Sequence, residues 1–193
     1  MKINELFIFT EEPSAKNVFN VILRKMLPKN IEFRIFEHQG KQDLEKALKT
    51  TLPTISKRPG SKILITRDQD NEDCLLVKNK INNLIKDSCH CDYYIRIVCR
   101  ELESWFLGDL EAIKKAYPRF KPENYKGKNK FKNVDKIHSP NKSLLKIIPE
   151  YSKRENLPKL ETSSQIAPFL EIDKNKSESF NQTILAIKKL LEL

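Results

Sequence analysis

The strongest constraint on the fold is an alternation of short apolar runs with longer amphipathic segments through the first hundred residues. Four runs have the length and the β-branched or aromatic content of strands, and they lie at residues 6–9, 31–36, 63–66 and 94–98. The segments between them carry apolar residues at helical spacing, and Leu75, Leu76 and Ile81 mark the third of these helices. Alternating strands and helices favour a mainly parallel sheet. The sequence therefore predicts an α/β core of order β-α-β-α-β-α-β over residues 1–100.

Beyond residue 100 the pattern becomes helical. Apolar residues from Leu102 to Ala116 share one helical face, with Trp105 as a core anchor, and Pro118 ends this helix. Lys and Asn dominate residues 119–142, which we expect to form a basic loop region with short structured pieces, while three more helices are predicted at 144–148, 162–169 and 180–193. We expect residues 101–193 to form a helical extension that packs on the core as one globular unit.

Composition excludes several classes of protein. The 193 residues are 39% hydrophobic and 32% charged, which is typical of a folded domain in water. No apolar stretch approaches the roughly 20 residues of a membrane-spanning helix, and the N-terminal sequence lacks the small-residue cleavage site of a signal peptide. We therefore expect a cytoplasmic protein without membrane contact, and reduced thiols at Cys74, Cys89, Cys91 and Cys99, which all fall within a short window.

The positive charge of the chain is concentrated in one stretch. Residues 114–154 hold 13 Lys and Arg residues against three acidic ones, a balance of +10 that equals the formal net charge of the whole chain. Charges in the rest of the sequence cancel. Such a block suggests a polyanionic partner, and the backbone of a nucleic acid is the commonest polyanion. The candidate contact lysines in this basic segment, as we call residues 114–154, are Lys126, Lys128, Lys130 and Lys132.

Acidic residues follow three of the four predicted strands. Glu11 and Glu12 come after the first strand, Asp68 and Asp70 after the third, and Glu103 after the fourth. In open α/β sheets ligands bind outside the carboxyl ends of the strands, so these side chains are candidates for a common site. Converging carboxylates repel one another and need protons or a cation between them, and oxygen ligands of this kind suit Mg²⁺ or Mn²⁺. The alternative is that these acids only cap helices.

The arrangement of the acids resembles the Toprim domain shared by topoisomerases, primases and a set of nucleases. An acid after strand one and an Asp-x-Asp after strand three carry the resemblance. It implies that Glu11 is the general acid/base or metal-binding glutamate and that Asp68 and Asp70 form the metal-binding pair. Glu12 stands where the family usually has Gly, so that either Glu11 or Glu12 can be the acid that faces the site.

A more extensive similarity is to a bacterial family of Toprim-like proteins, known mainly as a domain of unknown function and often encoded beside ATPases in mobile or phage-defence loci. It covers nearly the whole chain, and its motifs lie at residues 11–14, 38–44, 67–70, 100–109, 157–159, 166–168 and 177–180. The resemblance implies a possible partner ATPase. It defines the fold more closely than the reaction.

Four further residues are candidates for contact with a phosphate or a nucleic acid. Gly40 and Lys41 open the second predicted helix, where a lysine and free N–H groups can receive a phosphate, although a turn glycine beside a solvated lysine is the simpler interpretation. Arg67 is a further candidate for nucleic-acid contact. Lys159 lies in the helical tail and can approach a phosphate only if that tail folds back over the sheet.

Taken together, these features predict a divalent-metal-dependent nuclease that cleaves DNA or RNA phosphodiesters, with Mg²⁺ or Mn²⁺ held by acids among Glu11, Glu12, Asp68 and Asp70 and with Glu103 as a further catalytic carboxylate. The alternative is a non-catalytic Toprim-like module that binds nucleic acid or an ATPase. Dependence on a divalent cation separates the two.

Overall fold

Four parallel strands form the centre of the protein. The structure is a computed structural model that describes residues 5–193, so the first four residues of the predicted core lie outside the described part. The strands are β1 (Glu5–Thr10), β2 (Glu32–Glu37), β3 (Ser61–Asp68) and β4 (Tyr93–Val98), in the order β2-β1-β3-β4. All neighbouring pairs run parallel. The predicted α/β fold is confirmed.

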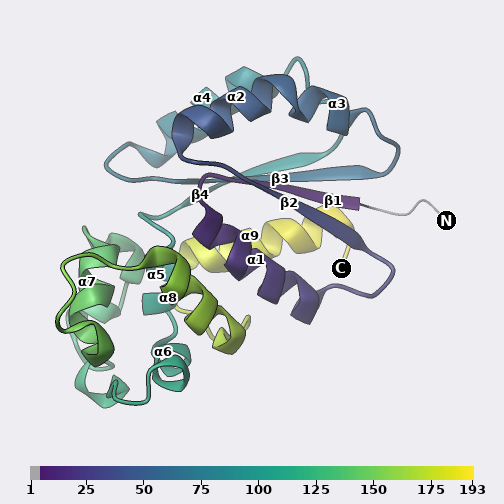
Figure 1. Ribbon diagram of the computed structural model, residues 1–193. Coiled ribbons are helices and arrows are strands. Elements are labelled where there is room, and N and C mark those ends of the chain that lie inside the picture. Colours follow the sequence, from purple (N-terminus) through teal and green to yellow (C-terminus); the bar gives the residue numbers. More distant parts are fainter. Residues whose placement is uncertain (1–4) are drawn as a thin grey trace.

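Helices cover both faces of the sheet. Figure 1 shows α2 (Lys41–Thr50), α3 (Leu52–Ser56) and α4 (Cys74–Ile85) on one face, with α1 (Pro13–Met26) and α9 (Glu178–Leu191) on the other. The strands supply a core on each side because successive side chains point to opposite faces. In β1, Phe7 and Phe9 pack toward one cluster while Leu6 and Ile8 pack toward the other.

The central pair of strands is also the point where the direction of strand addition reverses. From β1 the chain passes through α1 to β2 on one side, then returns across β1 to β3 and continues to β4 on the other side. A crevice at the carboxyl ends of two such strands is the usual ligand position in open α/β folds. The fold therefore directs attention to the residues that follow β1 and end β3.

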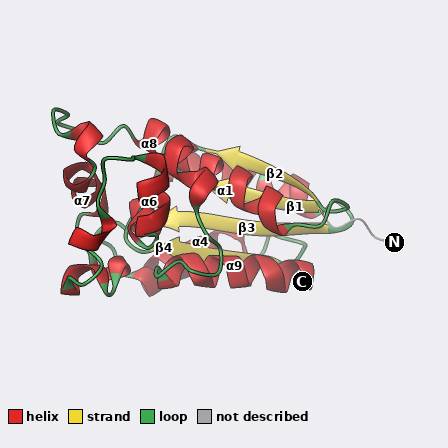
Figure 2. Cartoon of the chain, turned by 90° about the horizontal axis from the view of Figure 1, so that it is seen from below, coloured by secondary structure: helices red, strands yellow, loops and turns green. Residues whose placement is uncertain are grey.

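The helical part lies beyond the carboxyl ends of the strands (Figure 2). The helix predicted from residue 102 is in fact two, α5 (Glu103–Leu107) and α6 (Leu110–Ala116), because Asp109 begins a new helix by accepting the Ala112 N–H at 2.9 Å. The segment between β2 and β3 likewise holds two helices, α2 and α3. The basic segment contains α7 (Pro140–Ile147) and short 3₁₀ turns, and α8 (Lys159–Ile166) follows it.

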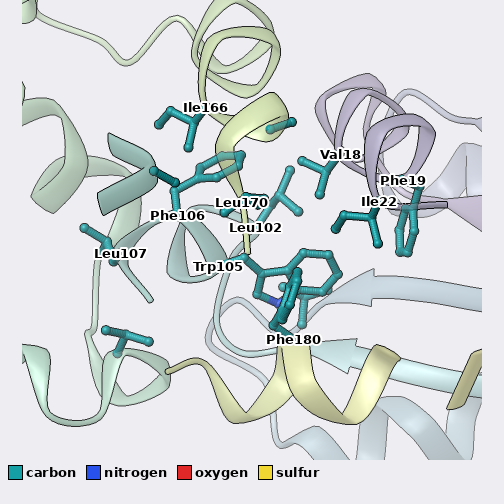
Figure 3. Packing of buried hydrophobic residues seen from close by; sticks show 14 of the residues in the cluster. Val18, Phe19, Ile22, Leu102, Trp105, Phe106, Leu107, Ile166, Leu170 and Phe180 are labelled. Carbon is teal, nitrogen blue, oxygen red and sulfur yellow. The ribbon is translucent and has the colours of Figure 1, made fainter. Parts of the chain in front are cut away.

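Trp105 anchors the junction between the sheet and the helical part (Figure 3). It is 1% exposed, and its ring meets Phe19 of α1 and Phe180 of α9 edge-on, at centroid distances of 5.8 and 5.2 Å. Its indole N–H donates to Ser179 Oγ at 3.0 Å, which satisfies the one polar atom of the side chain. The predicted role of Trp105 as a core anchor is confirmed.

Two residues outside the helices fasten α9 to α5. The Asn175 side chain donates to the Trp105 carbonyl at 2.8 Å, and its oxygen accepts the Ser177 N–H at 2.9 Å. Gly108 lies against this contact, where a Cβ atom would come within 2.1 Å of Asn175 Oδ1. The C-terminal helix is thus an integral part of the sheet's covering layer.

Helix α4 differs from its expected packing. Leu75 and Leu76 are 68% and 69% exposed, and the buried face is made by Val77, Ile81 and Ile85. The spacing of four residues in this buried set is that of one helical face. The apolar pattern predicted the helix correctly but not the orientation of its first turn.

Among residues 5–193, none of the helices combines the length and the apolar character needed to cross a lipid bilayer.

Candidate functional site

Glu11 and Asp68 meet at the carboxyl ends of β1 and β3. Both side chains are buried, and the Asp68 backbone N–H donates to Glu11 Oε2 at 3.1 Å. Burial raises the pKa of Glu11 despite this hydrogen bond. The pKa of Asp68 lies well above its usual range because of burial and the neighbouring charges of Glu103, Glu12 and Glu11. The structure therefore brings together two of the predicted site acids, in surroundings that penalise their negative charge.

Glu103 joins this pair from the first residue of α5. It is 1% exposed, and its Oε2 atom has no hydrogen-bond partner among the described residues. Burial raises the pKa of Glu103 to about 7, although the nearby ammonium group of Lys159 acts in the opposite direction. A carboxylate with this pKa exchanges a proton near neutral pH, which is the property of a general acid or base.

Glu12 faces a lysine that comes from the far end of the chain. Lys159, at the start of α8, places its Nζ 2.9 and 3.0 Å from the two carboxylate oxygens of Glu12. Ser14 Oγ donates to the same carboxylate at 3.3 Å. Burial lowers the pKa of Lys159, but the charges of Glu103 and Glu12 outweigh burial and raise it above its ordinary value. Lys159 therefore keeps its positive charge among Glu11, Glu12, Asp68 and Glu103, which we call the acidic group.

Contacts between α8 and α1 hold Lys159 in place. The side chain of Asn17 donates to Ser163 Oγ at 3.0 Å and to Ser164 Oγ at 2.9 Å. After α8, the Lys25 ammonium donates to the Pro168 and Leu170 carbonyls at 2.7 and 3.0 Å. The tail does fold back over the sheet, which is the condition set above for Lys159 to reach the site.

Asp70 stands apart from Asp68. It adopts a left-handed backbone conformation with φ of 53°, and its carboxylate pairs with Lys41 Nζ at 2.8 Å. The same lysine pairs with Glu72 at 3.0 Å. The hydrogen bonds to Asp70 and Glu72 raise the pKa of Lys41. Lys41 therefore bridges two acids beside the site, and Asp70 reaches Glu11 through its charge rather than through a contact.

Arg67 was expected to contact nucleic acid, but the structure places it in the interior. It is 2% exposed, contacts Glu72, and lies 3.9 Å from Glu11 and 4.0 Å from Glu45. Its guanidinium group lies among three acids and offsets their negative charge. In this conformation Arg67 supports the loop after β3 and is buried away from solvent.

Two residues near the site have structural roles. The backbone N–H of His38 donates to the Thr10 carbonyl at 3.1 Å, and the ring Nδ1 of His38 hydrogen-bonds the same carbonyl at 2.8 Å. Gly40 has φ of 98°, a region that favours glycine, and its N–H donates to the Glu11 carbonyl at 2.9 Å. These contacts fix the start of α2 against the end of β1. A shallow groove of about 530 Å³ runs past them to Glu12, Ser14 and Lys159.

The donor atoms of the site are of the type that Mg²⁺ and Mn²⁺ prefer. Glu11, Asp68 and Glu103 offer buried carboxylate oxygens, and the unpartnered Oε2 of Glu103 is free to accept a cation or a proton. Within residues 5–193, however, no three Asp, Glu, His or Cys side chains stand in a preformed metal-binding cluster. Lysines occupy Glu12 and Asp70, so the chemistry of the donors fits a divalent cation while the present arrangement is organised around ammonium groups.

The basic segment has a defined surface of its own. Lys126 pairs with Glu111 at 2.6 Å, Lys128 lies over the Tyr125 ring at 5.0 Å, and Lys130 donates to Ser143 Oγ at 2.9 Å. All four candidate lysines, including Lys132, are exposed. The segment adjoins the site through Asn141, whose N–H donates to Glu101 Oε2 at 3.1 Å just before α5.

The four cysteines are free thiols, as expected. The Cys89 thiol donates to the Cys91 carbonyl at 3.6 Å. Both cysteines precede β4 and pack against the hydrophobic cluster between the sheet and helices α2 and α4. Hydrogen bonding to Cys91 lowers the pKa of Cys89 to about 7.

Sequence reasoning found the acids but missed the importance of Lys159. The only signal was its place in the 157–159 motif, since no local pattern connects a residue in the tail with Glu12. That connection depends on how α8 packs against α1.

A comparison with protein-family profiles matches residues 10–188 to the family described as domain of unknown function DUF4276. The chain belongs to this family. The match runs from the last residue of β1 into α9 and includes every acid of the site together with Lys159. Searches of curated proteins and of solved structures give no match. For this DUF4276 protein, function therefore has to be argued from the site itself.

Proposed function

We propose that this protein is a divalent-metal-dependent nuclease, a phosphodiester hydrolase built on a Toprim-like core. The observation that carries the proposal is the group of three buried carboxylates with raised pKa values, Glu11 and Asp68 at the carboxyl ends of β1 and β3 and Glu103 at the start of α5. Acids following the first and third strands of a parallel sheet support the Toprim-like assignment.

The energetics of this group favour a functional over a structural role. A buried carboxylate that is ionised lacks the hydration it would have in water, which lowers the free energy of unfolding. Repulsion between neighbouring carboxylates lowers it further. Helix capping does not account for it, because Glu12 makes no capping hydrogen bond to α1, and the side chain that caps α4 is Asp73. Clusters of buried groups with shifted pKa values at a strand-end crevice are typical of catalytic and binding sites.

The proposal assigns roles to individual residues. Glu11 and Asp68 are the central cation ligands, with Glu12 and Asp70 beside them. Mg²⁺ or Mn²⁺ held there would stabilise charge on a phosphoryl group and promote the ionisation of water. Glu103 would hold or release a proton near pH 7, consistent with its pKa and its unpartnered oxygen.

The basic segment would supply the affinity for a strand. The basic segment adjoins the site, because the Asn141 N–H within the segment donates to Glu101 just before α5. Tyr125 adds an aromatic ring beside the exposed Lys128. Lysine contacts with phosphates are independent of base sequence, so DNA and RNA are both candidate substrates. A partner ATPase and a role in phage defence belong to the same proposal and derive from the family resemblance.

One observation favours a second candidate, a non-catalytic binding module. Lys159 pairs with Glu12 and Lys41 pairs with Asp70, so two of the acids are neutralised by the chain itself. In that case the acids stabilise the fold, and the basic segment alone binds nucleic acid or a partner protein. Mn²⁺ then has no effect on the protein.

A cleavage assay tests the proposal. Purified protein is incubated with labelled single- and double-stranded DNA and RNA, with Mn²⁺ or with chelator, in the presence and absence of the neighbouring ATPase. We expect cleavage that requires Mn²⁺ and is lost in Asp68→Asn, while Glu123→Gln, an exposed acid in the basic segment, cleaves normally. No cleavage under any of these conditions, or equal cleavage by Asp68→Asn, would overturn the proposal.

A further inference from the structure

Lys159 places a positive charge among the site acids. Its ammonium group touches both oxygens of Glu12 and carries the favourable charge interactions with Glu103 and Asp68. The three acids come from the β1–α1 junction, from α5 and from the end of β3, so one positive charge serves carboxylates from three parts of the fold.

The negative charge of the acidic group is not fully compensated by Lys159. Glu103 is 1% exposed, and its Oε2 atom has no hydrogen-bond partner among residues 5–193, although its charge interacts with those of Glu12 and Asp68. A buried carboxylate oxygen without a donor is costly and normally marks a place where a proton, water or ion binds. Lys159 therefore neutralises Glu12 directly, while Glu103 and the Glu11–Asp68 pair remain available to bind a cation or a proton.

The position of Lys159 is built into the fold. Helix α8 is held on α1 by the Asn17 side chain, which donates to two serine hydroxyls, and Ser163 itself is fully buried. Ser14 Oγ also donates to the Glu12 carboxylate, at 3.3 Å. The Lys159 side chain is 33% exposed and lines the groove of about 530 Å³. The packing of α8 on α1 therefore holds the backbone of Lys159 beside Glu12, and the ion pair with Glu12 holds its ammonium group.

We propose that Lys159 is the resident cation of the site, which neutralises Glu12 and so restricts the site to a single divalent ion on the Glu11–Asp68 side. This inference rests on the proposed metal-dependent function and specifies the number of ions. Two-metal hydrolases place a second ion about 3.5–4 Å from the first. Here the ammonium group supplies the second positive charge without an ion.

Titration with Mn²⁺ by calorimetry and electron paramagnetic resonance tests the stoichiometry without relying on activity. We expect one Mn²⁺ per wild-type chain and per Lys159→Arg chain, since arginine keeps the charge. Lys159→Met removes the charge but keeps an unbranched stem, and we expect it to bind two ions. The double variant Lys159→Met with Glu12→Gln should return to one.

Lys25→Met is the matched control. Lys25 also secures the tail to α1, through the Pro168 and Leu170 carbonyls, but it lies outside the acidic group. We expect it to bind one Mn²⁺, as the wild type does. A second ion in this control would show that loosening the tail, and not removal of the Lys159 charge, opens the site, which would overturn the inference.

The outcomes separate this inference from the proposed function. Two ions in the wild type, or one ion in both wild type and Lys159→Met, would leave the nuclease proposal intact and overturn the role of Lys159. No ion in the wild type together with one in Lys159→Met would overturn both the nuclease proposal and the single-ion site, since Lys159 would then exclude every divalent ion. No ion in either protein would overturn both. Where Lys159→Met does not fold, two ions in the wild type still overturn the inference, and Lys159→Gln, which also removes the charge, takes the place of Lys159→Met in the comparison.

Discussion

Replacing Glu103 by glutamine tests the electrostatic character of the site through stability alone. Burial raises the pKa of Glu103 from 4.5 to about 7. A carboxyl group whose pKa is raised on folding favours the folded state when it is protonated and opposes it when it is ionised. The stability that the protonated form provides is complete below pH 4.5 and is lost as the pH rises to about 7.

The magnitude follows from the size of this shift. Each pKa unit corresponds to about 1.4 kcal/mol, so ionised Glu103 lowers the free energy of unfolding by about 3 kcal/mol above pH 7. Because the side chain is 1% exposed, solvent screening does not reduce this figure appreciably. Glutamine has nearly the same shape and no charge, so Glu103→Gln removes the penalty at high pH.

Urea denaturation in the presence of a chelator measures the effect. The free energy of unfolding of Glu103→Gln minus that of the wild type should be about 3 kcal/mol more favourable at pH 8 than at pH 4.5. Any constant cost of burying the amide cancels in this comparison. The exposed control Glu123→Gln should show no such change with pH. If the gap between Glu103→Gln and wild type were the same at both pH values, the assignment of a buried, strained carboxylate would be refuted.

Two further predictions concern other parts of the protein. If the basic segment contacts about six phosphates, a plot of the logarithm of nucleic-acid affinity against the logarithm of salt concentration should have a slope near −5. The slope should flatten when four lysines are neutralised together, namely Lys126, Lys128, Lys130 and Lys132. An affinity that does not change with salt concentration would contradict this prediction. Gly108→Ala should lower the free energy of unfolding by about 1–3 kcal/mol in thermal or urea denaturation, because its Cβ would lie 2.1 Å from Asn175 Oδ1; an unchanged stability would show that the α5–α9 contact adjusts freely.

Much of the fold was predictable because its signals are local. Period-two and helical patterns located all four strands and the main helices. The errors arose where tertiary contacts decide the outcome. Leu75 and Leu76 satisfy a helical pattern but lie on an exposed first turn, and the helix expected to run from residue 102 is interrupted where Gly108 packs against Asn175.

The site was predictable in part for a related reason. Glu11 and Asp68 end up together because parallel strands bring their carboxyl ends to one edge, a consequence of topology that sequence order reveals. Asp70 and Arg67 were placed less well, since the loop after β3 turns Asp70 toward Lys41 and buries Arg67. Lys159 depends on contacts between residues more than 140 positions apart, which no single sequence pattern encodes.

The central claim is that Glu11 and Asp68 bind a divalent cation, and a calorimetric Mn²⁺ titration tests it most directly. The wild type and Asp68→Asn are compared at pH 7.5, with circular dichroism to confirm that both are folded. The backbone N–H of residue 68, which donates to Glu11, is retained in the variant. We predict saturable binding by the wild type and a loss of at least about tenfold in affinity, or about 1.4 kcal/mol, in Asp68→Asn. Equal affinity in the two proteins, or no binding by the folded wild type, would contradict the account.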